Sequence, residues 1–69
     1  MKEEIINLYS KVATKNDFIF ELSQVVDRAP NTIRTHWFSK ANFYSIPVEL
    51  QITVRDFAIE YLENQKATA

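Results

Sequence analysis

Hydrogen-bonding and basic side chains are concentrated in one stretch of this 69-residue chain, between Arg28 and Lys40. Their types suit the recognition of a nucleic-acid duplex. Arginine can bond guanine bidentately and asparagine can do so to adenine. Hydroxyl groups, cations and backbone N–H groups can hold phosphate. The candidate DNA-contacting residues are Arg28, Asn31, Thr32, Arg34, Thr35, Ser39, Lys40 and Pro30, the last as the first residue of the backbone stretch 30–32 that could hold phosphate.

The distribution of charge along the chain favours recognition of nucleic acid, whereas the net charge does not. The net charge is −1, which by itself argues mildly against binding to nucleic acid. However, no acid lies between Asp27 and Glu49, so Arg28, Arg34 and Lys40 make the middle of the chain locally basic. The alternative is an ordinary solvated surface, on which Asn31 and the residues after it only cap and solvate a short helix.

Two short helices joined by a tight break must position these residues. Apolar spacing predicts one helix from Asp17 to Asp27, capped by Asn16 or Asp17, and a second from Pro30 to about Phe38. Ile33 and Trp37 are four residues apart and mark the buried side of the second helix.

The sequence Leu-Ser-x-x-Val-Asp-x-Ala-Pro-x-Thr-Ile-x-x-His resembles the helix-turn-helix of LuxR/GerE-type regulators. The core of that family reads roughly Ile-Ala-x-x-Leu-Gly-Ile-Ser-x-x-Thr-Val-x-x-His. Ser23 matches its small residue, Asp27 stands at its turn glycine, and Thr32, Ile33 and His36 match its Thr-Val-x-x-His signature.

The resemblance covers Glu21 to Phe38 and has departures. Arg28 occupies an apolar turn position, Ala29 replaces the capping serine, and the sequence leaves the pattern after His36. The resemblance implies a helix-turn-helix over about residues 17–38, with recognition helix 30–38 in the major groove of double-stranded DNA. Because of these departures we expect a helix-turn-helix of another subfamily, such as that of a small phage or mobile-element regulator, and not a true LuxR member. We expect His36 to be a partly buried residue bonded to backbone, with a base or phosphate contact as the alternative.

The rest of the chain predicts an all-α fold, a single domain of four helices. The chain lacks glycine, which the favoured tight hairpins require. A first helix is predicted over Lys2 to Ala13, and a connector over Ser39 to Ser45 in which Phe43 and Tyr44 fold back on the core. The last helix, Pro47 to about Gln65 with Ser45 as its cap, is the longest.

The last helix has two apolar stripes instead of the single stripe that a surface helix needs. One stripe comprises Leu50, Val54, Phe57, Ala58 and Tyr61. The second predicts a homodimer through a dimerisation helix at about residues 46–65, with a two-fold contact made by Val48, Ile52, Arg55, Ile59 and Leu62. Alternatively, this stripe docks on another protein, and the chain is a small helical interaction module such as an inhibitor or adaptor.

Several functional classes are not expected. The chain has no cysteine and one histidine, so no disulfide and no metal site is predicted. Without glycine it has no phosphate-cradling loop, and no nucleophile–base pair stands out, so we expect neither an enzyme nor a cofactor or small-molecule ligand. No stretch reads as a signal peptide or membrane span, so a cytoplasmic location is expected.

Overall fold

The computed structural model describes residues 1–68, with side chains to Lys66, and within this range it is helical with no strand. The predicted all-α class is therefore confirmed. The elements are α1 (Lys2–Ser10), α2 (Lys15–Val26), α3 (Pro30–Thr32), the π-helical turn η1 (Ile33–Trp37), the 3-10 turn η2 (Lys40–Asn42) and α4 (Val48–Thr68). Because η1 continues α3 without a break, residues 30–37 form one helix, which we call the α3–η1 helix.

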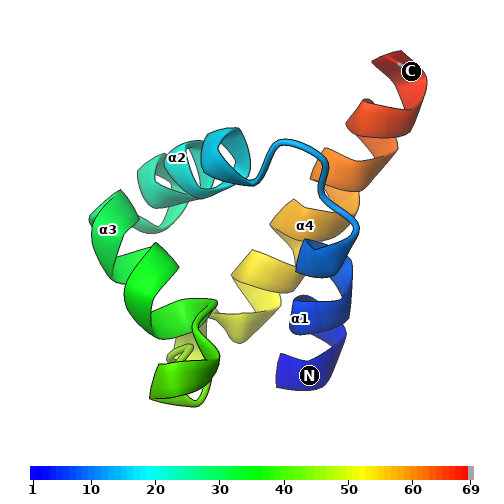
Figure 1. Cartoon of the computed structure of the whole chain (residues 1–69). Helices are drawn as coiled ribbons and strands as arrows, with labels where there is room; N and C mark the ends of the chain where they lie inside the picture. Colours follow the sequence, from blue (N-terminus) through cyan, green and yellow to red (C-terminus); the bar gives the residue numbers. More distant parts are fainter. Residues whose placement is uncertain (69) are drawn as a thin grey trace.

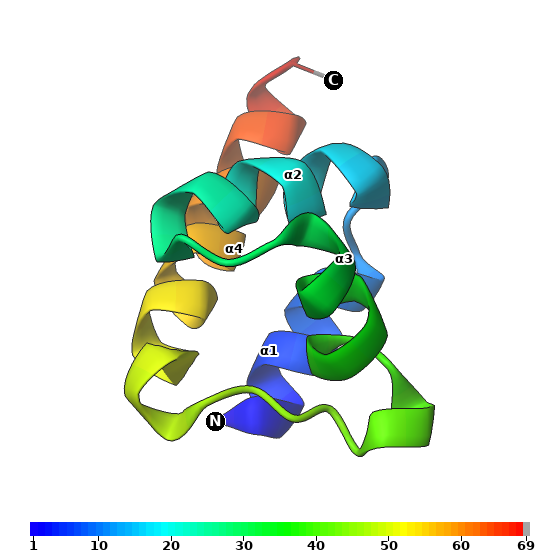
Figure 2. The ribbon, with the colours of Figure 1, turned by 90° about the vertical axis from the view of Figure 1, so that its left-hand side faces the viewer.

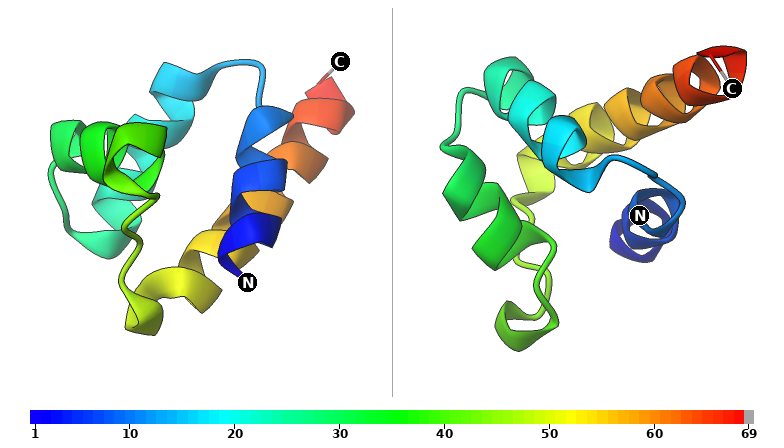
Figure 3. Two further views of the ribbon diagram at one scale, coloured as in Figure 1. Left: turned by 60° about the horizontal axis from the view of Figure 1, so that its bottom comes forward. Right: turned by 45° about the horizontal axis from the view of Figure 1, so that its top comes forward.

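The long helix α4 is the element on which the others are assembled (Figure 1). Both α1 and α2 pack against α4, whereas the α3–η1 helix packs against α2. The final turns of α4 extend past the other helices (Figures 1 and 3). The α3–η1 helix therefore lies at the side of the bundle, where one of its faces is open to solvent.

The core is a continuous apolar cluster centred on Phe18 of α2, which is fully buried. Its ring lies 5.7 Å from Tyr9, 6.0 Å from Phe38, 5.2 Å from Phe57 and 5.2 Å from Tyr61, measured between ring centroids. These rings come from α1, the residue after η1, and α4, so Phe18 connects every part of the bundle. The predicted inner stripe of α4 is also confirmed, because Val54 and Ala58 are buried and Leu50, Phe57 and Tyr61 pack against the core.

Two predicted helix caps are wrong. Helix α2 begins at Lys15, with Thr14 in the cap position, so neither Asn16 nor Asp17 caps it. The Thr14 and Tyr61 hydroxyl groups instead bond each other at 2.7 Å. Ser45 does not cap α4, because that helix begins at Val48 and the Ser45 hydroxyl donates to the Asn42 carbonyl.

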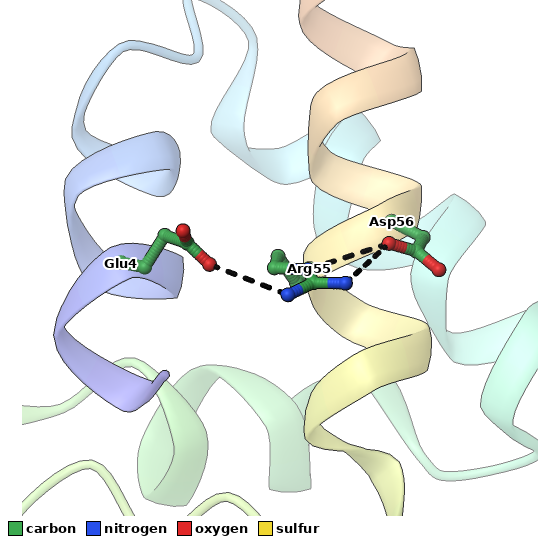
Figure 4. Close-up of polar contacts among 3 residues, drawn as sticks. All are labelled: Glu4, Arg55 and Asp56. Atoms are coloured by element: carbon green, nitrogen blue, oxygen red, sulfur yellow. Dashed lines mark hydrogen bonds and ion pairs between the residues drawn. The ribbon is translucent and has the colours of Figure 1, made fainter.

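An arginine of α4 ties that helix to α1 (Figure 4). Arg55 Nη1 lies 3.7 Å from Glu4 Oε1, and Arg55 Nη2 lies 3.3 Å from Asp56 Oδ1. The Arg55 side chain is 32% exposed and that of Glu4 is 56% exposed. Exposed pairs of this kind contribute little, about 0–1 kcal/mol, so the aromatic core dominates the packing.

Candidate nucleic-acid interface

The turn before the α3–η1 helix is built on a left-handed residue, Asp27, with φ 56° and ψ 49°. The Ser23 carbonyl accepts the backbone N–H of Asp27 and, at 3.2 Å, that of Arg28. Glycine is the usual residue at such a helix end, and aspartate is one of the few others that tolerate it. The buried Ser23 hydroxyl donates to the Phe20 carbonyl. The chain thus makes a tight turn between two helices without glycine.

Burial within the α3–η1 helix follows the predicted pattern. Ile33 is 0% exposed and Trp37 is 3% exposed, which confirms the predicted buried side. The Phe38 N–H donates to the Ile33 carbonyl at 3.2 Å, five residues back, as in a π-helix. A π turn brings residues five apart onto one side, so Phe38 joins Ile33 and Trp37 at the core.

The outward face of this helix is polar, and Figure 2 looks toward it. Pro30 is half-buried. The other side chains on this face are exposed: Asn31, Thr32, Arg34, Thr35 and His36. The Thr35 hydroxyl donates to the Asn31 carbonyl at 2.7 Å. The expectation that His36 is partly buried is wrong, because its side chain is exposed. Its carbonyl accepts the Ser45 N–H at 2.7 Å.

Three cations of this segment, one on the helix and one at each end of it, have no carboxylate partner. Arg28, Arg34 and Lys40 are all exposed, and both ion pairs among the side chains of residues 1–66 involve Arg55 instead. Arg28 Nη1 lies 3.3 Å from the Asp27 carbonyl oxygen. The remaining predicted contact, Ser39, is half-buried. The basic groups of this face are therefore available to an anionic ligand.

The first turn of α2 adds two residues to this face that the sequence analysis did not single out, Lys15 and Asn16. Arg34 Nη2 lies 3.5 Å from Asn16 Oδ1. Lys15 Nζ lies 5.5 Å from the centroid of the Tyr9 ring and donates to the Val12 carbonyl at 2.9 Å. Burial raises the pKa of Tyr9, and the charge of Arg34 partly opposes this rise. Because Asn16 contacts Arg34 and Lys15 directly precedes Asn16, the first turn of α2 brings a fourth cation close to this face.

The second stripe of α4 is only partly open. Val48, Ile52 and Ile59 are 80%, 55% and 40% exposed, and we call these three residues the open stripe. Leu62 packs against the core, and Arg55 is held by Glu4 and Asp56. At 100° per residue the open stripe points away from Phe57, whose ring contacts Phe18 of α2. The open stripe and the polar face of α3–η1 therefore belong to different sides of the molecule.

In the part of the chain that the structure describes, no helix has the length and apolar character to cross a membrane. Over the same residues, no group of three histidine, cysteine or carboxylate side chains is placed to hold a metal ion. Comparison of the chain with protein-family models, curated proteins and solved structures found no significant match.

Proposed function

We propose that the chain is a homodimeric transcriptional regulator that binds double-stranded DNA sequence-specifically through the α3–η1 helix in the major groove. One observation carries the proposal. This helix is anchored by buried Ile33 and Trp37, and its opposite face presents polar side chains and cations that no carboxylate pairs. A helix that reads the major groove requires such a face, with a rigid apolar side behind it.

The polar side chains divide into base-reading and phosphate-binding groups. Asn31 and Arg34 are three residues apart, so they are neighbours on the helix surface. We assign adenine to Asn31 and guanine to Arg34, because these side chains form bidentate hydrogen bonds with those bases. Phosphate is assigned to the groups around them, namely Arg28, Thr32, Lys40 and Lys15. The methyl group of Thr35 can contact thymine, because its hydroxyl is bonded to the Asn31 carbonyl.

A single protomer carries few cations for this task, which is why the proposal includes a dimer. Three or four phosphate contacts give weak binding at physiological salt, and two protomers double their number. The open stripe of α4 is an apolar surface suited to a two-fold contact. Dimeric DNA-binding proteins of this kind place their recognition helices about 34 Å apart, one turn of DNA, so two protomers would bind two half-sites at that spacing.

The same stripe favours a second candidate function. Val48 is 80% exposed and Ile52 is 55% exposed, so the stripe can also dock on a different protein. In that case the chain is a small helical inhibitor or adaptor. The two functions differ in solution: the DNA-binding proposal requires the isolated chain to dimerise, whereas an adaptor that docks through this stripe is monomeric until its partner is added.

The test is selection of bound sequences from a pool of random duplexes, using the full chain at low salt. The expected result is enrichment of a two-fold symmetric motif, with half-sites about one helical turn apart. A folded protein that retains no duplex from the pool contradicts the proposal. An Arg34→Ala variant is selected in parallel and is expected to relax the preference at the base assigned to Arg34.

A further inference from the structure

The turn that follows the α3–η1 helix holds a phenylalanine in solvent. Phe43 is 81% exposed, although the sequence analysis predicted that it folds back on the core. Figure 2 shows this turn, which contains η2, beside the C-terminal end of α3–η1. The neighbouring exposed residues Lys40, Ala41 and Ser45 are polar or small. Phe43 is therefore a single aromatic ring in a polar and basic setting, unlike the apolar core of a protein interface.

The backbone holds this ring outward in an unfavourable conformation. Phe43 and Tyr44 are both left-handed, with φ 54° and φ 50°. Residues with a Cβ atom rarely adopt this conformation, and two in succession persist only where other contacts impose them. Here the Tyr44 N–H donates to the Ser39 carbonyl at 3.1 Å, and Lys2 Nζ donates to the Phe43 carbonyl at 3.2 Å. Strained positions of this kind occur preferentially at functional sites.

Two further hydrogen bonds attach the turn to main-chain carbonyls in the last turn of the α3–η1 helix. The Asn42 side-chain amide donates to the Thr35 carbonyl, and the Ser45 N–H donates to the His36 carbonyl at 2.7 Å. The turn and the helix consequently form one rigid unit. Lys40 and Phe43 therefore hold fixed positions relative to Asn31 and Arg34, and a ligand that binds the two helix residues encounters the two turn residues at those positions.

We propose that Phe43 is an apolar wedge that inserts between base steps of the duplex, in the minor groove beside the major-groove segment bound by α3–η1. This inference rests on the proposed function. Architectural DNA-binding proteins insert single apolar side chains in this way and kink the duplex. Base steps offer flat apolar surfaces that bury a lone ring. Lys40, which is exposed three residues before Phe43, would supply a cation for a phosphate beside the inserted ring.

The test compares the full-length wild type, Phe43→Ala and Phe43→Leu on a duplex obtained by selection. Phe43→Ala is expected to weaken binding about tenfold, because stacking and insertion contribute at this level. The dependence of affinity on salt should remain unchanged, because an apolar contact releases no counterions. Phe43→Leu should restore most of the affinity, since leucine also serves as a wedge. Energy transfer between dyes on the duplex ends should show a bend that Phe43→Ala removes.

The controls separate this inference from the proposed function and from folding. The thermal midpoint of Phe43→Ala should match that of the wild type, because the ring is exposed. Val25→Ala, which truncates an exposed apolar residue facing the groove between α2 and α4, should leave binding unchanged. If the wild type binds no duplex, the proposed function fails. If the wild type binds and Phe43→Ala binds equally well with the same bend, the wedge alone is overturned.

Discussion

The ring of Tyr9 on α1 stacks on the ring of Phe38, with centroids 4.1 Å apart and planes inclined by 10°. Phe38 ends the π turn of the α3–η1 helix, because its N–H donates to the Ile33 carbonyl. The first helix of the chain thus fixes the end of the helix that carries the candidate interface. Burial raises the pKa of Tyr9 and the charge of Arg34 partly opposes this rise, so Tyr9 lies between the core and the charged face.

This arrangement predicts a loss of stability at alkaline pH that depends on Tyr9. Burial raises the pKa of Tyr9 above 10.0, its ordinary value, so the folded chain holds this proton more tightly than the unfolded chain. The contribution is fully present below pH 10 and is lost as the pH rises through the pKa of the folded state. Urea unfolding across this range should show a smaller alkaline loss for Tyr9→Phe than for the wild type. Equal losses in the two proteins contradict the assignment.

The left-handed turn predicts opposite effects of glycine at two nearby positions. Asp27→Gly should raise the free energy of unfolding by up to about 1 kcal/mol, because glycine adopts positive φ without steric cost. Gln24→Gly should lower it by about 1 kcal/mol, because Gln24 lies within α2. Chemical denaturation measures both values. If Asp27→Gly destabilises the chain as much as Gln24→Gly does, Asp27 does not have the left-handed conformation described here.

The sequence was sufficient where local rules decide the outcome. Apolar periodicity predicted the inner stripe of α4 and the burial of Ile33 and Trp37, since a helix must bury one side. Asp27, which stands where the resembled pattern has glycine, takes a left-handed conformation.

Tertiary contacts and irregular backbone account for what the sequence analysis got wrong or missed. A π turn departs from the 3.6-residue period by which apolar spacing predicts helices, so it was not predicted. His36, which was expected to be partly buried, is exposed. Two left-handed residues turn Phe43 outward, although its apolar character predicted burial. The packing of α1 and α2 brings Lys15 over the ring of Tyr9. The spacing of residues along the sequence does not predict this contact, so Lys15 was not identified as part of the charged face.

The proposed dimer predicts a specific effect of charge on the open stripe. Ile52→Glu and Ile59→Glu should convert the dimer to a monomer, because each places a carboxylate in an apolar contact. Thr53→Glu is the matched control, since Thr53 is exposed on the same helix but lies outside the stripe. Sedimentation velocity at micromolar concentration distinguishes the species. A wild type that sediments as a monomer rules out this role for α4 and favours the adaptor function.

The most direct test of DNA binding by the dimer is the salt dependence of its affinity for a duplex. Fluorescence anisotropy on a selected sequence measures this affinity. A dimer that uses six to eight phosphate contacts should lose affinity with a logarithmic slope of about −5 to −7. Lys40→Ala should make the slope less steep, and Arg34→Ala should weaken binding by about 1–3 kcal/mol and relax base preference. Absence of binding at about 50 mM salt by the folded chain would contradict the central claim.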